Sequence, residues 1–253
     1  CLINFSQEII QPSIPVNVST DVIDVGCFND ATGSINLTIS GGTPPYDFDW
    51  SNGSTSEDIF NLVAGTYSYV ILDANLCQLT GAEVISQPSE LVVTNQITNI
   101  DCHGESTGVI DLTVTGGTFP YSYSWSNSLY QLSTTSQDLI NLEQDTYQYE
   151  VVDDNGCLKS DTLTVYESPD LVSQITGQNI LCYGGTNGLV DLTVNGGVGA
   201  YSFFWNNLEI TEDINNLTAG YYEVQVTDSL GCTLLDSITL TQPLDSLDFS
   251  YEV

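Results

Sequence analysis

The sequence predicts an all-β protein, a tandem array of small β-sandwich repeats that together form an extended rod. Three observations predict this fold class: the same landmark residues recur three times, the segments between them alternate apolar and polar residues, and no segment carries a helical apolar stripe. The composition allows a folded chain, because 41% of the 253 residues are hydrophobic and 10% are aromatic.

The internal repeat is marked by cysteine, glycine, tryptophan and tyrosine at fixed spacings. In each copy a first cysteine is followed by a Gly-Gly pair, then a tryptophan, then a tyrosine ten residues before a second cysteine, and finally a proline. The first cysteines are Cys27, Cys102 and Cys182, the tryptophans are Trp50, Trp125 and Trp205, and the second cysteines are Cys77, Cys157 and Cys232.

The same spacing sets the predicted boundaries. Cys1 stands eleven residues before Pro12, as Cys77 does before Pro88, so we expect Cys1 to be the second cysteine of an upstream repeat. The predicted parts are the end of an upstream repeat at 1–12, three repeats at 13–88, 89–169 and 170–243, and the start of a downstream repeat at 244–253.

Each repeat reads as a series of short strands. The first clear strand covers residues 35–39 and its equivalents 110–114 and 190–194, which alternate β-branched or leucine residues with polar ones. A Gly-Gly turn leads to an aromatic strand that ends at the tryptophan, and a later strand begins at the tyrosine. About seven short strands with a tryptophan on a central one indicate an immunoglobulin-like sandwich, whose aromatics we expect in the core.

The later tyrosines fit a tyrosine corner, in which the hydroxyl bonds to the backbone across a turn. They are Tyr67, Tyr147 and Tyr222, each five residues after a leucine. The second copy has Asp145 where the others have glycine, so we expect a looser corner there. It also has five extra residues around 127–136, which predict a longer surface loop.

The charge balance excludes several partners. The chain has 33 acidic residues against one Lys or Arg, which gives a net charge of −32. Nucleic acid and anionic membranes need clusters of basic residues, so neither is expected as a partner. No apolar run approaches the length of a membrane helix, and we expect no membrane insertion in this segment.

The seven cysteines indicate disulfides and an oxidising compartment. Pairing within repeats is the simpler scheme and our preferred prediction: Cys27–Cys77, Cys102–Cys157 and Cys182–Cys232. An immunoglobulin topology argues against it, since it places the first and second cysteines at opposite ends of the sandwich. The alternative joins successive repeats, as Cys27–Cys157 and Cys102–Cys232.

Other chemistry is weakly indicated. His103 is the only histidine and has no nucleophile context, so we expect a solvated turn residue and no enzyme. No organic cofactor is expected, and the metal that suits so acidic a surface is Ca²⁺. The candidate calcium ligands are the turn aspartates Asp73, Asp153, Asp154 and Asp228.

The motifs together resemble the SprB repeat. The second copy shows the pattern as Gly116-Gly117-Thr118-Phe119-Pro120-Tyr121, then Trp125-Ser126-Asn127, then Val152-Asp153-Asp154-Asn155-Gly156-Cys157. The family is named for a gliding-motility adhesin of Bacteroidetes. The resemblance implies export by type IX secretion, an extracellular location on an outer membrane-attached filament, and partners that include the gliding and secretion machinery.

The expected function is therefore a structural and adhesive stalk segment of a large cell-surface adhesin, with neighbouring repeats of the same chain as partners. The alternatives are a module that binds surface glycans, the substratum or a protein, and a passive spacer in another secreted protein. Short Asp-Ser/Thr-apolar motifs, which such bacteria O-glycosylate, occur at Thr162, Ser229, Ser237 and Ser246.

Overall fold

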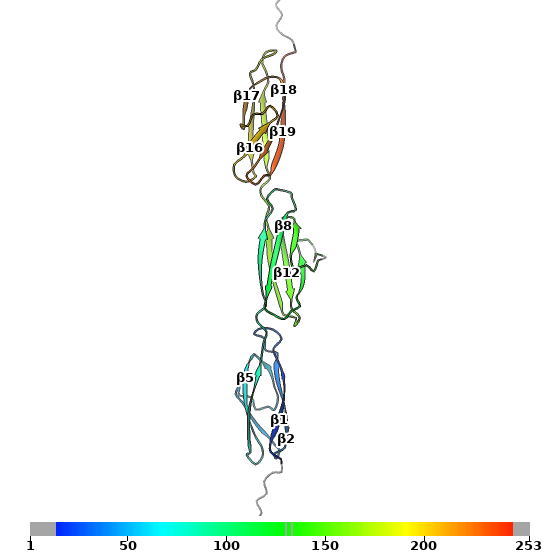
Figure 1. Cartoon of the computed structure of the whole chain (residues 1–253), viewed down its shortest axis with the longest axis vertical. Coiled ribbons are helices and arrows are strands. Elements are labelled where there is room, and N and C mark those ends of the chain that lie inside the picture. The colour runs from blue at the N-terminus through cyan, green and yellow to red at the C-terminus, as the bar shows by residue number, and fades with distance from the viewer. Residues whose placement is uncertain (1–13, 130, 133, 245–253) are drawn as a thin grey trace, which may run out of the picture. The chain divides into compact units, whose positions relative to one another are not determined.

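A computed structural model describes residues 14–129, 131–132 and 134–244. The predicted segment 1–12 and all of the predicted segment 244–253 except Leu244 therefore lie outside the described residues. All regular elements of the described part are strands, β1 to β19, as the arrows of Figure 1 show. Within these ranges no helix is long and apolar enough to cross a membrane.

The first repeat folds as two antiparallel three-stranded sheets. One sheet has the order β1-β2-β4 and the other β3-β5-β6. The strands are β1 (Asn17–Ile23), β2 (Gly33–Ser40), β3 (Asp47–Trp50), β4 (Ile59–Leu62), β5 (Gly65–Leu72) and β6 (Gln78–Ile85).

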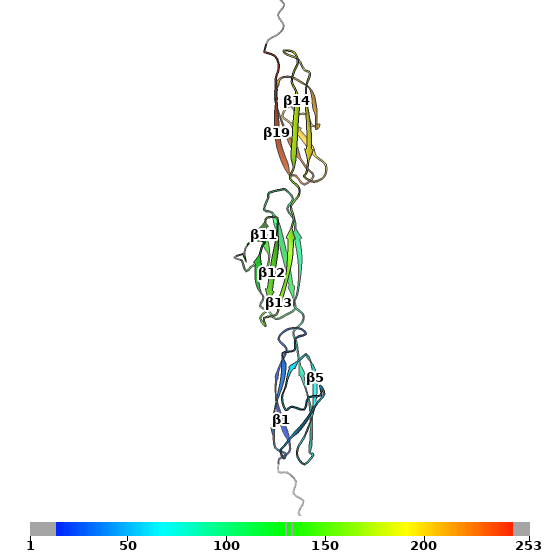
Figure 2. The same ribbon diagram turned by 180° about the vertical axis from the view of Figure 1, so that it is seen from behind.

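The third repeat has the same topology, with sheets β14-β15-β17 and β16-β18-β19. In this repeat Figure 1 labels β16, β17, β18 and β19, and Figure 2, turned by 180°, labels β14 and β19. The strands are β14 (Val172–Gln178), β15 (Gly188–Asn195), β16 (Ser202–Trp205), β17 (Ile214–Leu217), β18 (Gly220–Thr227) and β19 (Thr233–Leu240).

The second repeat adds one strand to this plan. Its sheets are β11-β8-β7 and β10-β9-β12-β13. The extra strand, β10, lies in the five-residue insertion, which we predicted to be a loop, and pairs through Gln131 and Leu132 with Ser126 and Trp125. The strands are β7 (Val92–Thr98), β8 (Gly108–Thr115), β9 (Ser122–Ser126), β10 (Gln131–Leu132), β11 (Leu139–Leu142), β12 (Asp145–Val152) and β13 (Leu158–Val165).

This topology is immunoglobulin-like, because strands one, two and four form one sheet and strands three, five and six the other. The described residues of the first and third repeats form six strands and those of the second form seven, close to the predicted number of about seven. The connection from β3 to β4 is short and is tied to the sandwich by two hydrogen bonds: the Trp50 indole N–H donates to the Ser56 carbonyl (2.9 Å), and Asp58 accepts the Leu37 N–H (2.9 Å).

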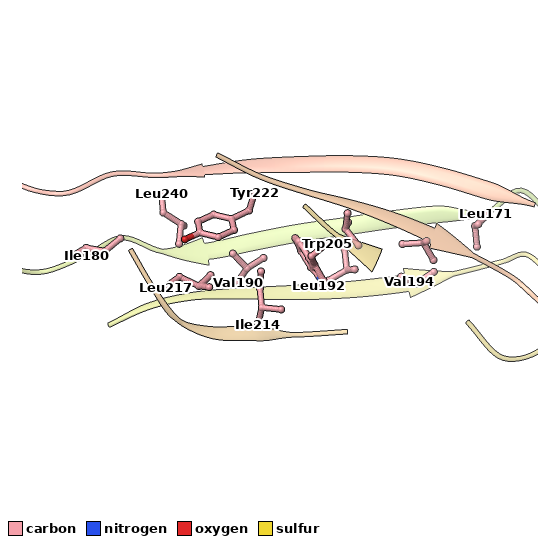
Figure 3. Packing of buried hydrophobic residues seen from close by; sticks show 12 residues of the cluster. Leu171, Ile180, Val190, Leu192, Val194, Trp205, Ile214, Leu217, Tyr222 and Leu240 are labelled. Atoms are coloured by element: carbon pink, nitrogen blue, oxygen red, sulfur yellow. The ribbon is translucent and has the colours of Figure 1, made fainter. Parts of the chain in front are cut away.

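The core lies between the two sheets of each repeat, around the tryptophan. Trp205 is fully buried, and its indole N–H donates to the Thr211 carbonyl at 2.9 Å. Figure 3 shows its ring beside Leu192, with the ring of Tyr222 beside Leu240. Trp50 and Trp125 are buried in the same way, so the central-strand aromatics belong to the core.

Each Gly-Gly turn needs glycine for two reasons. Both residues of each pair have φ between 56° and 77°, which favours glycine. In addition, a Cβ on Gly196 would lie 1.8 Å from the Asp170 carbonyl oxygen, and one on Gly116 would lie 1.8 Å from that of Glu90. The pair thus lets the turn close on the segment that opens its own repeat.

The tyrosine hydroxyls make the hydrogen bonds that define a tyrosine corner. Tyr67 donates to Val63, Tyr147 to Glu143 and Tyr222 to Thr218, at 3.0, 3.0 and 2.9 Å. The expectation of a looser second corner is therefore wrong. Asp145 is accommodated because its carboxylate accepts hydrogen bonds from the Ser128 hydroxyl of the insertion and from the Thr146 N–H.

The chain divides into two compact units, and the second repeat contributes to both. One unit comprises residues 1–94, 113–124 and 149–161, and the other comprises 95–112, 125–148 and 162–253. Residues 113–124 and 149–161 of the second repeat belong to the unit that contains the first repeat. Most of the remaining second repeat belongs to the unit that contains the third repeat. One disulfide lies within each unit.

Candidate functional site

The disulfides join successive repeats, so the predicted pairing within repeats is wrong. Cys27 bonds to Cys157 and Cys102 to Cys232, with Cα–Cα distances of 5.6 and 5.5 Å. The reason is topological: the first cysteine follows the first strand of a repeat, whereas the second precedes the last strand, and these positions lie at opposite ends of a sandwich. The alternative scheme, from repeat to next repeat, is the observed one.

The first cysteine of each pair lies in a loop that we call the first-cysteine loop (residues 24–32, 99–107 and 179–187). A turn within the loop brings the Asp30 N–H to the Cys27 carbonyl at 3.1 Å. A side chain near the end of the same repeat fixes the loop: Gln87 Oε1 accepts the Asn29 N–H at 2.9 Å. In the second repeat Glu167 does the same for the Gly104 N–H, also at 2.9 Å.

The second cysteine lies in a tight turn built on a buried aspartate, the second-cysteine turn (residues 73–77, 153–157 and 228–232). Asp153 accepts three backbone N–H groups, from Thr118 (2.8 Å), Asn155 (3.0 Å) and Cys157 (2.8 Å). Asp73 and Asp228 accept the equivalent three, so all three turns have one hydrogen-bonding pattern.

These hydrogen bonds lower the pKa of two of the aspartates. For Asp73 the main cause is the N–H of Cys77, which outweighs the opposing effect of burial. For Asp228 burial is the largest influence and acts to raise the pKa, but the N–H groups of Val198, Cys232 and their neighbours together reverse it.

Polar contacts accompany each disulfide. The Asn155 side chain donates to the Gly26 carbonyl (2.9 Å), next to Cys27, and also to the Thr118 hydroxyl (3.0 Å). Cys157 Sγ lies 3.4 Å from the same Gly26 oxygen, and Cys232 Sγ lies 3.3 Å from that of Asp101. Each bonded pair also lines a surface pocket, the first with Phe28 and the second with His103.

Two further cysteines of the described residues, Cys77 and Cys182, are exposed and free. Cys77 occupies a second-cysteine turn and Cys182 a first-cysteine loop. Although the residue as a whole is exposed, partial desolvation and the nearby Asp73 carboxylate raise the pKa of the Cys77 thiol.

The predicted calcium ligands fall into two groups. Asp73, Asp153 and Asp228 are buried and direct their carboxylates at backbone N–H groups, whereas the neighbouring Asp154 is exposed. In the part of the chain that the structure describes, no three His, Cys, Asp or Glu side chains form a group that could hold a metal. The three buried aspartates anchor their turns, and calcium binding stays a prediction.

Three predicted O-glycosylation residues are exposed. Thr162 lies in β13, Ser237 lies in β19, and the Ser229 hydroxyl donates to the Val198 carbonyl from a turn. Ser246 lies outside the described residues. Modification of these residues stays a prediction.

Sequence reasoning missed the side chains that fix the first-cysteine loops: Gln87, Glu167 and Gln242. Their signal was their recurrence shortly before the proline that closes each repeat. Glu167 also contacts His103, with 2.9 Å between Oε1 and Nδ1, so the histidine is paired as well as partly exposed.

The internal repeats coincide with a known family. The SprB repeat model matches residues 19–55, 94–129 and 175–209, which in each copy run from the first strand to just beyond the tryptophan. No curated protein sequence matches the chain.

Among solved structures, the chain is similar to arrays of immunoglobulin domains. It is 11% identical to the N-terminal eight Ig domains of Down Syndrome Cell Adhesion Molecule isoform 1.30.30, with a TM-score of 0.44, over 92% of this chain and 44% of that one. It is 10% identical to Drosophila OTK extracellular domains 3–5, with a TM-score of 0.35, over 91% of this chain and 100% of that one. The chain thus spans less than half the length of the first.

SprB repeats are of an extracellular type, and the two disulfides fit an extracellular segment. The three matches fall in register with the three sandwiches deduced from the cysteine and tryptophan spacing. The chain is therefore a tandem array of three sandwiches, and the SprB repeat model matches part of each one.

Proposed function

We propose that this chain is a load-bearing stalk segment of a large cell-surface adhesin of gliding bacteria, exported by type IX secretion and acting in surface attachment and gliding motility. One observation carries the proposal: both disulfides join a repeat to the next one instead of closing a repeat on itself. Each repeat already has its own buried core, so these bonds add a covalent connection between neighbours.

That connection changes the path along which tension passes. From Cys27 to Cys232 the backbone has 205 residues, about 700 Å when fully extended. The shortest covalent path from Cys27 uses the first disulfide to reach Cys157 and then follows 55 backbone residues back to Cys102. The second disulfide then connects Cys102 to Cys232. That path extends to only about 190 Å. A segment of this kind unfolds under force without lengthening fully.

Single-molecule stretching of the chain by its two ends tests the load-bearing role. We expect the oxidised chain to release about 190 Å between Cys27 and Cys232, and the reduced chain about 700 Å. The Cys232→Ser variant keeps one bond and should give an intermediate release of about 260 Å, since 75 backbone residues then complete the path. Equal extension of oxidised and reduced chains would contradict a load-bearing function.

The cellular part of the proposal needs the intact parent protein. We expect antibodies raised against this segment to label surface filaments that move along gliding cells. If the antibodies instead label a secreted protein with a catalytic domain, this segment would be a passive spacer in that protein.

A binding role is the second candidate, and the insertion of the second repeat favours it. Leu129 in this insertion is 81% exposed, and the other two repeats have no equivalent segment. If the insertion binds a glycan or a protein, replacing residues 127–136 by the shorter connection of the first repeat should abolish attachment of the purified chain to its surface.

A further inference from the structure

A pocket of about 600 Å³ lies beside the Cys27–Cys157 disulfide. Its lining comes from three segments: the first-cysteine loop 24–32, residues 90–91 at the start of the second repeat, and residues 156–159, which lead into β13. All three segments belong to one compact unit of the chain. Small-molecule sites in proteins have volumes of about 300 to 1,000 Å³, so this pocket is large enough for a small organic ligand.

Two hydrogen bonds and the disulfide hold the walls of this pocket in place. Gln87 Oε1 accepts the Asn29 N–H at 2.9 Å, which fixes the first-cysteine loop. The Asn155 side chain donates to the Gly26 carbonyl at 2.9 Å, and the disulfide joins the same two segments covalently. The walls are therefore in position before a ligand arrives, which lowers the entropic cost of binding.

Three charged side chains line the pocket. Lys159 is the single Lys or Arg of the chain, and Asp30 and Glu90 supply two carboxylates. All three residues are exposed, and their charged groups make no hydrogen bond or ion pair with any other described residue. The pocket therefore offers one cationic and two anionic groups that a ligand can reach.

Apolar side chains line the same pocket. Phe28 and Leu158 are 39% and 58% exposed, so a ligand can contact both. Covering them with the apolar part of a ligand would remove apolar surface from water, which favours binding in proportion to the area covered. The lining is therefore suited to a ligand that carries both charged and apolar groups.

The pocket beside the second disulfide is an internal comparison. It is smaller, about 280 Å³, and keeps two carboxylates at the equivalent positions, Glu105 and Asp170. Leu234 takes the place of Lys159, since each stands two residues after the second cysteine of its disulfide. The combination of a lysine with the two carboxylates is therefore particular to the first junction.

We propose that the pocket at the first junction binds a small zwitterion, namely a short apolar peptide with free amino and carboxyl termini. Its carboxylate binds Lys159, its amino group binds the carboxylates of Asp30 and Glu90, and its apolar side chains cover Phe28 and Leu158. An acid without an amino group would meet two carboxylates, and an amine without a carboxylate would meet Lys159, so a ligand with both charges is favoured. Binding of this kind is independent of the load-bearing role, which needs only the disulfides.

The dipeptide Phe-Leu is the probe for this site, and Lys159 can report its binding directly. Because the chain has one lysine, isotope-labelled lysine gives a single backbone NMR signal. We expect this signal to shift saturably as Phe-Leu is added to the oxidised chain, with a Kd of about 1 mM. The absence of a saturable shift, or a shift with the neutral sugar maltotriose in place of Phe-Leu, would overturn the proposal.

Blocked forms of the probe test the two charges separately. Phe-Leu amide lacks the carboxylate, and N-acetyl-Phe-Leu lacks the amino charge. Each should bind about fivefold more weakly than Phe-Leu, which is the upper range for the loss of one exposed ion pair. Equilibrium dialysis measures all three affinities, and equal binding of the three forms would contradict recognition of a zwitterion.

Lys159→Leu, which gives the first pocket the residue of the second, separates a direct contact from a general effect on the fold. In this variant Phe-Leu should bind about fivefold more weakly while the amide binds as before, so the difference between the two forms disappears. Asp30→Asn should instead reduce the difference between Phe-Leu and its acetylated form. Glu105→Gln, at the second junction, is the matched control and should leave all affinities unchanged. A preference for Phe-Leu over its amide that persists in Lys159→Leu would rule out the assigned contact.

Discussion

At the scale of single residues, much of the acidic character of this chain is structural. The three turn aspartates accept backbone N–H groups, and Asp58, Asp138 and Asp213 each accept the N–H of a core leucine on a neighbouring strand. With one Lys or Arg in the whole sequence, these aspartates are satisfied by backbone N–H groups. The charge of −32 is thus partly a product of folding requirements.

The turn aspartates predict a specific pH dependence. The pKa of Asp228 is lowered in the fold, so its stabilising effect is complete above the ordinary value of 3.8 and is lost as the pH falls through the lowered value. In Asp228→Asn the amide N–H₂ opposes the backbone N–H donors. Urea unfolding from about pH 2 to pH 7 should show a deficit at neutral pH that shrinks in acid.

Asp154→Asn is the control, because Asp154 is exposed and lies in the equivalent kind of turn. The urea concentration at the unfolding midpoint of Asp154→Asn should equal that of the wild type at every pH. A deficit of Asp228→Asn that persists unchanged at the lowest pH would argue against a role for the ionised carboxylate.

The Gly-Gly turn gives a prediction with an internal control. Gly196→Ala adds the strain of a positive φ and places a methyl group against the Asp170 carbonyl, so it should destabilise the third repeat by at least about 3 kcal/mol. Gly231 has a φ of 91° but open space around it, so Gly231→Ala should cost about 1 kcal/mol. Thermal or urea unfolding of the two variants checks the difference, and equal losses would show that the close approach is unimportant.

At the scale of elements, the two departures of the second repeat are linked. Asp145 replaces the glycine found at the start of the equivalent strands, and its carboxylate binds Ser128, which the insertion supplies. The Ser128 hydroxyl is the main cause of the lowered pKa of Asp145, with the Thr146 N–H second. β10 is therefore an addition at the edge of a complete sandwich.

Removing the insertion should accordingly leave the second repeat folded. We expect replacement of residues 127–136 by the equivalent shorter connection of the first repeat, combined with Asp145→Gly, to change the unfolding temperature by no more than about 4 °C. Asp145→Gly alone is the matched control. Loss of the cooperative unfolding transition in the shortened chain would show instead that β10 belongs to the core structure.

Much of each element could be predicted from the sequence, because it depends on local patterns. Alternation of apolar residues predicted the strands, and the recurrent tryptophan and tyrosine predicted the core and the corner bonds. The disulfide partners could not be predicted, since one bond spans 130 residues and depends on which ends of two repeats meet. The caps Gln87 and Gln242 were missed for a related reason, as each reaches 58 residues along the chain.

At the scale of the whole molecule, the two disulfides enclose overlapping stretches of chain, 27–157 and 102–232. Pairing within repeats would have produced separate disulfide loops, and successive repeats would have been joined by the backbone alone. The overlap makes the first, second and third repeats one covalent network. Any measurement that cuts or reduces the chain at one place should reveal this connectivity.

Trypsin offers such a measurement, because Lys159 is the single Lys or Arg. Cleavage of the denatured, unreduced chain after Lys159 should leave one mass, since Cys102–Cys232 joins the two fragments. Reduction should release fragments 1–159 and 160–253. Cys232→Ser should separate them without reductant, whereas Cys157→Ser should not, and fragments that separate from the unreduced wild type would contradict the observed pairing.

The overlap of the two disulfide loops also has a consequence for survival outside the cell, where proteases abound. The cysteines divide the backbone between Cys27 and Cys232 into three stretches. A nick in any one stretch leaves the molecule in a single piece, and so do simultaneous nicks in any two of them, because the remaining stretch and the two bonds still connect all four cysteines. The segment therefore tolerates proteolytic cleavage, and its two ends separate only when all three stretches are cut.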